Sequence, residues 1–276
     1  MPALNRGGGA PVIRMPGAIL ADPTSAVALQ LRRDFITQFL TICPDTRLLL
    51  VPLPTDTTTS TSVDRNARTV TYDATIASRI GVVGSATSVS YTAASSQYAT
   101  IPDAANLSFG DGTNDSPFSI VVWQNQTTAT ATQVLLSKRD TGASAEEWVL
   151  YNDTNSLELA LYDNSAGPAA IIVDATALAT GSWLNIAATY DGSRANSGMK
   201  LYSAAALLTV TPSVSGTYVA MENLASAVMI SGEQPSSKIR PFNGLLGPIA
   251  LVAKELTIDD LWALKQLGNG YLGLTL

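Results

Sequence analysis

The sequence predicts an all-β protein, a sandwich of two sheets that follows an N-terminal arm and a single amphipathic helix. Beyond residue 67, short segments with alternating apolar and polar residues recur along the chain, which is the pattern of half-buried strands. Turn-forming pairs such as Asp111-Gly112 and Asp191-Gly192 separate these segments. Hydrophobic residues make up 46% of the chain, enough for a sizeable core, and many short strands with almost no helix favour two packed sheets.

Residues 1–22 are rich in glycine, proline and alanine and include Gly7-Gly8-Gly9. A segment of this composition buries too little apolar surface to fold alone, so it is interpreted as an extended arm that becomes ordered against a partner, or as a frayed terminus. Asp22-Pro23 then predicts the start of a helix, with Asp22 as N-cap and Pro23 at the first helical position.

An amphipathic helix over residues 23–42 is predicted because Val27, Leu31, Phe35 and Phe39 recur every four positions, and Pro44 ends it. Such a helix could cover its own domain, which is the commoner case, or contact another subunit. It lies between the arm and a threonine-rich stretch at 55–62 that is typical of a linker. We therefore predict an attachment module at residues 1–62 and a sandwich at 63–276, with the four apolar side chains of the helix binding a partner.

The segment 184–190 is the clearest strand, because Leu184, Ile186, Ala188 and Tyr190 share one face and mixed residues share the other. It is expected to lie in the middle of a sheet. The full set of predicted strands is 68–72, 86–91, 98–101, 118–123, 133–137, 147–151, 157–162, 170–173, 184–190, 200–203, 207–210, 228–231 and 249–252.

One short helix is predicted near the C-terminus. Thr257 and Asp260 have the spacing of a capping box, and a stripe of leucines follows at positions 261, 264 and 267. Gly268 is a natural helix terminator, so residues 271–276 are expected to return to the sheet as a last strand.

Charged residues make up only 14% of the chain, which indicates a surface that neighbouring subunits cover. The net charge of −6 argues against nucleic acid as a partner, because the pairs Arg32-Arg33 and Lys138-Arg139 are isolated and favour solvated side chains or local ion pairs. The single cysteine, Cys43, is expected to be a small core residue. Neither a signal peptide nor a membrane span is apparent, so synthesis in a cytoplasm is expected.

Seven motifs follow one another along the predicted sandwich: Tyr98–Asp103, Phe118–Trp123, Leu135–Lys138, Trp183–Gly192, Lys200–Tyr202, Phe242–Gly247 and Leu256–Leu261. Their order resembles that of the laminin-G-like, concanavalin-A-like jelly rolls over roughly residues 64–276. The resemblance implies a curved double sheet, which relatives use for glycan binding, for protein adhesion or as a structural appendage. It does not imply one activity, because this fold carries several unrelated functions.

The residues predict that the protein is not an enzyme and has no catalytic residues. Glycosidases that resemble this architecture carry Glu-x-Asp-x-Glu on one strand, because both carboxyl groups must face the same groove. That motif is absent here, and the adjacent Glu146 and Glu147 would point to opposite faces of a strand. The chain has no histidine, which excludes a Ser-His-Asp triad and any histidine-containing metal site.

No cofactor or metal ligand is predicted, although the resemblance leaves calcium open. Asp111, Asp115, Asp153 and Asp163 lie in predicted loops but do not have a recognisable ligand spacing, and turn formation is the commoner role of such residues. A sugar site would need an exposed aromatic platform. The patterns around Trp123, Trp183 and Trp262 predict burial instead, and the position of Trp148 is left open.

The arm, helix, tether and lectin-like sandwich together resemble a virion structural protein of a tailed bacteriophage. In this hypothesis residues 1–62 anchor the chain to a capsid or tail, through other virion proteins or identical subunits, and the sandwich is displayed as decoration or adhesin. Its location would be the virion, after synthesis in the host cytoplasm, and a host-surface glycan is a possible partner. The alternative is a bacterial glycan- or protein-binding module of the lectin-like type.

Overall fold

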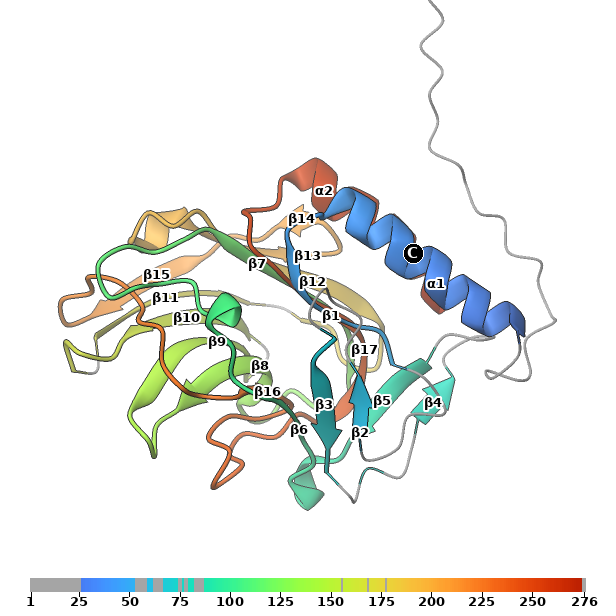
Figure 1. Ribbon diagram of the computed structural model, residues 1–276, viewed down its shortest axis with the longest axis horizontal. Coiled ribbons are helices and arrows are strands. Elements are labelled where there is room, and N and C mark those ends of the chain that lie inside the picture. The colour runs from blue at the N-terminus through green and yellow to red at the C-terminus, as the bar shows by residue number, and fades with distance from the viewer. Residues whose placement is uncertain are drawn as a thin grey trace, which may run out of the picture.

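The computed structural model describes residues 26–52, 59–61, 67–73, 76, 79–81, 87–154, 156–167, 169–176 and 178–274. Within these ranges the chain forms two antiparallel sheets, which pack face to face around a large apolar core. Helices α1 (Ala26–Ile42) and α2 (Ile258–Leu272) lie side by side on one of the sheets (Figure 1). The predicted all-β sandwich with an N-terminal helix is confirmed.

The first sheet has eight strands in the order β14-β13-β12-β7-β17-β5-β4, and β1 also pairs with β17. The predicted strand at 207–210 is shorter than expected, because β14 ends at Leu207. The strands β1 and β4 were not predicted. The bounds are β1 (Thr46–Leu50), β4 (Arg79–Gly81), β5 (Thr87–Tyr91), β7 (Phe118–Gln126), β12 (Leu184–Tyr190), β13 (Met199–Ser203), β14 (Ala206–Leu207) and β17 (Gly244–Val252).

The second sheet has nine strands in the order β15-β11-β10-β9-β8-β16-β6-β3-β2. Of these, β2 and β15 were not predicted. The bounds are β2 (Thr59–Thr61), β3 (Thr69–Tyr72), β6 (Ala99–Ile101), β8 (Gln133–Asp140), β9 (Ala145–Asp153), β10 (Ser156–Asp163), β11 (Ala169–Thr176), β15 (Thr211–Ser215) and β16 (Val228–Ile230).

Aromatic rings fill one end of the core between the sheets. Phe118 stacks on Phe109 with ring centroids 4.5 Å apart and meets Tyr190 edge to face at 5.9 Å. Strand β12 has the predicted faces, since Ile186 and Tyr190 point into this core and Ala187 points to the opposite side. Alternation along the strands therefore determines which residues meet between the sheets.

A second apolar layer lies on the outer face of the eight-stranded sheet, under the two helices. Trp123 projects from β7 and is fully buried there, with its ring 6.2 Å from that of Phe35 on α1. Leu261 and Leu264 of α2 belong to the same cluster. The helices are thus the cover of a sheet face that would otherwise expose tryptophan and aliphatic side chains to water.

The structure corrects the expectation that the helix faces a partner. Phe35 and Phe39 are 2% and 0% exposed because they pack on the chain's own sheet, so neither is free to bind another subunit. Leu31 is partly buried. The side chain of Val27, the arm at 1–22 and the predicted cap Asp22-Pro23 lie outside the described residues.

The predicted attachment module is also not a separate body over residues 26–52. Strand β1 pairs with β17, as in Leu49 opposite Ala250, and its residues enter both apolar clusters. The strand was not predicted from the sequence; Pro52 follows its last paired residue, where proline breaks no ladder bond. The threonine-rich stretch contains β2, which pairs with β3, and residues 53–58 lie outside the described ranges.

The C-terminal helix begins as predicted and ends later than predicted. The Thr257 hydroxyl accepts a hydrogen bond from the backbone N–H of Asp260, and the Asp260 carboxylate accepts one from the backbone N–H of Thr257, which confirms the capping box. The helix continues through Gly268 to Leu272 and ends at Gly273, whose backbone is left-handed. The predicted strand at 271–276 is therefore wrong at residues 271 and 272, which are helical, and residues 275–276 lie outside the described residues.

Gly268 lies inside α2, where the absence of a side chain permits close contact with the sheet. A Cβ atom at this position would lie 2.1 Å from ring atoms of Trp123, whereas one at Gly270 would meet nothing within 4 Å. Glycine ordinarily weakens a helix interior by about 1 kcal/mol. The absence of a side chain at position 268 is what allows α2 to lie directly on the indole.

We expect Gly268→Ala to lower the free energy of unfolding by about 1–3 kcal/mol, because the added methyl group overpacks the contact with Trp123. Gly270→Ala is the matched control and should be neutral or stabilising by up to about 1 kcal/mol. Urea denaturation of both variants measures the difference. Equal stability of the two variants would contradict the account of how α2 packs.

Candidate functional site

The outer face of the nine-stranded sheet is the face that the helices leave uncovered (Figure 1). On strands β9 and β10, Trp148 and Leu159 point into the core between the sheets, and Val149 and Ala160 point outward. Tyr151 also points outward, and in the register of the two strands it lies opposite Glu158. Polar and aromatic side chains thus gather on one exposed surface of the sandwich.

A cavity of about 200 Å³ opens on this outer face, and we call it the polar pocket. All of its lining side chains carry hydrogen-bonding groups. Strands β8, β9 and β10 supply five of the seven residues, and the connections before β8 and before β17 supply the other two. The lining residues are Thr132, Arg139, Tyr151, Asp153, Glu158, Tyr162 and Arg240.

Two arginines of the pocket are held by the fully buried carboxylate of Glu233. Arg139 Nη1 lies 2.6 Å from one oxygen of Glu233, and Arg240 pairs with the other. Arg139 also pairs with Glu146 at 2.6 Å, donates to the hydroxyl of Tyr151 at 2.9 Å and lies over the ring of Tyr162. The guanidinium groups are therefore fixed in place before any ligand arrives.

Glu158 gives the pocket a group that titrates near neutrality. Burial raises its pKa to about 7, with a further increase from the carboxylates of Asp153 and Asp174, while Arg240 and Arg139 oppose the shift. Thr132 donates to Asp153 at 2.5 Å. Near pH 7 the pocket thus combines acceptors, donors and a carboxyl group that can serve as either.

Sequence reasoning missed this site because its parts are scattered. Arg139 and Glu233 are 94 residues apart, so no local motif contains both. The pair Lys138-Arg139 was interpreted as solvated or locally ion-paired; the ion pairs are present, but the side chain of Lys138 is fully buried. Alternation on β9 and β10 was the one usable signal, since it places Tyr151, Glu158 and Tyr162 on one face.

The tryptophans do not form a sugar platform on this face. Trp123 and Trp148 are fully buried, and the indole N–H of Trp148 donates to the backbone of Leu107. Trp183 is partly buried against the layer under the helices. The predicted burial of Trp262 is wrong: it is 54% exposed because it lies on the outer side of α2, away from the buried leucine stripe.

The aspartates considered as metal ligands hold loops instead. Asp115 accepts hydrogen bonds from the hydroxyls of Tyr190 and Tyr218, and Asp163 accepts one from the backbone of Val219. Asp111 accepts from backbone N–H groups of its own turn. In the described part of the chain, histidine, cysteine and carboxylate side chains do not gather in a group of three that could hold an ion.

The thiol of Cys43 is buried in the layer under the helices, as the sequence suggested. Burial raises its pKa to about 12, with a further increase from Asp260, so it carries no thiolate at neutral pH.

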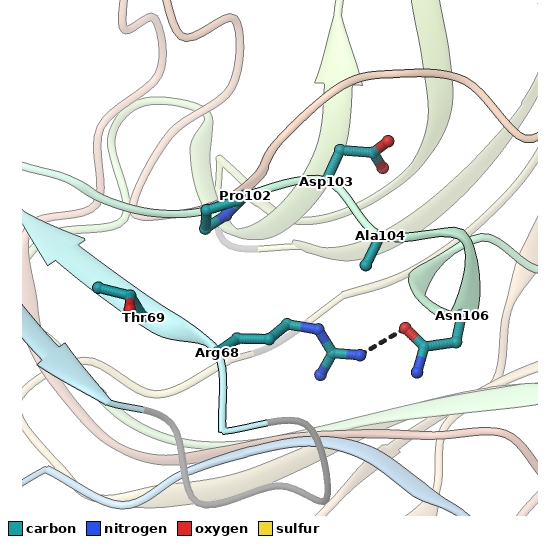
Figure 2. Close-up of a pocket in the computed structure, with 6 residues that line it drawn as sticks. All are labelled: Arg68, Thr69, Pro102, Asp103, Ala104 and Asn106. Carbon is teal, nitrogen blue, oxygen red and sulfur yellow. Dashed lines mark hydrogen bonds between the residues drawn. The ribbon is translucent and has the colours of Figure 1, made fainter.

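A larger cavity, of about 390 Å³, lies near the ends of β3 and β6 and is lined by Arg68, Thr69, Pro102, Asp103, Ala104 and Asn106 (Figure 2). Arg68 is already engaged, because it donates to the backbone carbonyl of Arg47 at 2.6 Å and to the side chain of Asn106. Figure 2 shows the carboxylate of Asp103 turned away from Arg68. The polar pocket is therefore the better candidate for a ligand site.

Comparison with known proteins identifies the fold. The concanavalin A-like lectin/glucanases superfamily matches residues 93–261, more than half of the chain. No curated protein sequence matches the chain. Neither helix of the described residues is long and apolar enough to span a membrane.

Several solved structures share the sandwich at low sequence identity. The ligand binding domain of botulinum neurotoxin serotype D in complex with N-acetylneuraminic acid superimposes with a TM-score of 0.59 and 11% identity, covering 83% of this chain. The binding domain of Paraclostridial Mosquitocidal Protein 1 superimposes with a TM-score of 0.59 and 10% identity, covering 81% of this chain. Trypanosoma rangeli sialidase superimposes with a TM-score of 0.56 and 14% identity, covering 88% of this chain. This chain spans about half (52%) of each of the two binding domains and 38% of the sialidase. At such identities the likeness shows the fold alone.

The titration of Glu158 predicts how stability depends on pH. Its pKa in the folded protein, about 7, lies above the ordinary value near 4.3, so the folded state binds the proton more tightly. The free energy of unfolding should therefore fall as pH rises from about 4.5 to 7 and then level off. Glu158→Gln removes this contribution and should stabilise the protein at pH 8 by on the order of 1–2 kcal/mol relative to wild type.

Urea denaturation between pH 4.5 and 8 measures the effect. Glu255→Gln is the control, because Glu255 is not one of the pocket residues and pairs instead with Lys200, at a distance of 2.5 Å. This variant should leave the pH dependence of the free energy of unfolding unchanged. Burial also raises the pKa of Glu147 to about 7. Glu147 is present in wild type and in both variants, so it adds the same pH dependence to all three proteins. Parallel profiles for wild type and Glu158→Gln would show that the pocket does not perturb this carboxyl group.

Proposed function

Because the chain belongs to the concanavalin A-like lectin/glucanases superfamily, we propose that it is a non-enzymatic glycan-binding module whose ligand site is the polar pocket. The observation that carries the proposal is the lining of that pocket, in which all seven side chains carry groups that can donate or accept hydrogen bonds. A sugar ring presents alternating hydroxyl donors and acceptors, and fixed arginine, carboxylate and tyrosine groups match that alternation.

The charges around the pocket favour a neutral sugar. The two arginines are offset by the buried Glu233 and by Glu146, with which they pair. Asp153 and Glu158 then add negative charge to the lining itself. A similar fold in the toxin domain is complexed with N-acetylneuraminic acid, which supports a glycan as the ligand class, but an anionic sugar would be repelled here.

The non-enzymatic part of the proposal rests on the residues available. The chain has no histidine and no Glu-x-Asp-x-Glu motif, and Glu233 is held in ion pairs by Arg139 and Arg240 rather than presented to a substrate. A carboxylate neutralised in this way is a poor nucleophile.

Arg240→Ala tests the proposal on a glycan array. The side chain of Arg240 is 42% exposed, and Arg139 still pairs with Glu233 when Arg240 is removed. We expect the wild-type chain to bind neutral glycans and the variant to bind at least about tenfold more weakly, since a lost charged hydrogen bond is worth roughly 1.5–3 kcal/mol.

Arg33→Ala removes the same charge from the exposed side of α1, on the opposite face, and should bind as wild type does. Equal losses in both variants, or binding to no glycan on the array, would refute the assignment of the pocket.

A role as a virion structural subunit stays a second proposal. Its support is apolar surface on the outer side of the helices, where Ile258 and Trp262 are 48% and 54% exposed and Leu29 is 37% exposed. Such side chains are typical of surfaces that other subunits cover. With residues 26–52 packed on the sandwich, the proposed anchor to capsid or tail proteins, or to identical subunits, consists of residues 1–25 and this helical surface.

Deletion of residues 1–25 tests the anchor. We expect the truncated chain to melt at the same temperature as the full chain, because α1 keeps its contacts, and to lose the association that the full chain shows in sedimentation. A full chain that is monomeric at all concentrations and does not enter particles would end this proposal.

A further inference from the structure

One lysine is fully buried near the cavity of Figure 2, with two carboxylates around its amine. Lys138 Nζ lies 2.6 Å from Glu147 Oε1 and 2.8 Å from Asp103 Oδ1, and it donates to the backbone carbonyl of Leu224 at 2.5 Å. The side chains of Lys138 and Glu147 are both 0% exposed. Asp103 is 34% exposed and lines the cavity.

The sequence builds this arrangement with a β-bulge. Lys138 lies opposite Trp148, but its neighbour Arg139 lies opposite Glu146, so Glu147 is an extra residue in β9. An extra residue turns its side chain out of the regular alternation, and Glu147 meets Lys138 as a result. Asp103 follows β6, which is separated from β8 by β16 alone. Three elements thus bring one amine and two carboxyl groups together.

A plain ion pair does not account for this group. One ammonium is matched with two carboxylates, which leaves excess negative charge where burial is costly. Oε1 of Glu147 accepts from Lys138, from Ser108 and from the backbone of Leu224, whereas its Oε2 is buried without a hydrogen-bond partner. Burial raises the pKa of this carboxyl group to about 7 despite the neighbouring ammonium. Such a group is suited to hold a proton and pass it on.

We propose that Lys138 and Asp103 condense into an intramolecular amide, with Glu147 as the catalytic proton carrier. Glu147 takes a proton from the Lys138 ammonium, and the free amine attacks Cγ of Asp103. Glu147 passes this proton to one Asp103 oxygen and then carries a second proton from the attacking nitrogen to the same oxygen. The C–O bond breaks, and that oxygen leaves as one water molecule. An ammonium and a carboxylate become an amide and water, so charge and atoms balance, and no oxidant or cofactor is required.

The geometry is close to that of the reacting state. Cγ of Asp103 is one C–O bond beyond Oδ1 and therefore within about 4 Å of Nζ, near the ~3–3.5 Å of a near-attack conformer. Groups held at this distance reach effective molarities that drive condensation even in water. The leaving water has an exit, because Asp103 lines the cavity. After reaction the amide N–H remains within hydrogen-bond reach of Glu147.

The bond would tie the segment after β6 to β8 across β16, within the nine-stranded sheet. A covalent tie of this kind closes a loop in the unfolded chain and so stabilises the folded state. It involves none of the residues that line the polar pocket, so its presence or absence is independent of glycan binding.

Intact-mass measurement of the purified full-length chain tests the proposal. We expect a mass lower than that of the sequence by one water molecule. Digestion under denaturing conditions after the aromatic residues Phe109, Phe118 and Trp123, which lie between the two positions, should then release a branched peptide joining Asp103 to Lys138.

Variants separate the amide from other losses of water. Glu147→Gln should keep the full sequence mass, because it cannot carry the proton. Asp103→Asn should lose ammonia in place of water, whereas Asp103→Ala should lose neither. The full sequence mass for wild type after prolonged incubation would overturn the proposal. So would a water loss located at Asp111-Gly112 or Asp191-Gly192, where a succinimide forms within the backbone.

Discussion

The burial of Trp123 determines how the rest of the molecule is arranged. This side chain points outward from the central strand β7, on a sheet face that also carries Val121, Ala187 and Val252. A face so apolar has to be covered. The chain covers it with α1 from before the first strand and α2 from after the last, so both ends of the described chain are drawn to the same side of the sandwich (Figure 1).

That arrangement leaves the outer face of the nine-stranded sheet uncovered. Its outer face carries a small apolar strip of Val134, Val149 and Ala160, beside which Arg139 and Tyr151 begin a polar network. The buried Glu233 holds this network together from the segment before β17. A fixed set of charged donors and acceptors costs little ordering on binding, which is why this face rather than the helical one suits a hydroxyl-rich ligand.

Alternation and turn residues were sufficient to predict the sandwich, because they report directly on which side of a strand faces the core. They failed where tertiary context decides. Strand β1 was not predicted, and the close packing of Gly268 depends on the indole of Trp123 lying beneath it. The sequence predicted that Phe35 lies on the contact face of a helix, but we assigned that contact to a partner outside the chain. An amphipathic pattern shows which face of a helix is buried and does not show which surface buries it.

The site was harder to predict than the fold for the same reason. Glu233 reaches Arg139 across 94 residues, and no local pattern encodes such a pairing. The register shift that turns Glu147 toward Lys138 is likewise a property of two strands together. Tyr151 and Tyr162 could be placed on one face from the sequence, but the arginines that lie over their rings could not.

The central claim is that the face opposite the helices binds the ligand. Hydrogen–deuterium exchange of the full chain, with and without a neutral glycan at saturating concentration, addresses it most directly. Protection is expected in β8, β9, β10 and the segment 231–243, with α1 and α2 unchanged. Protection confined to the helices, or to the loops around Asp115 at the end of the sandwich, would contradict the account.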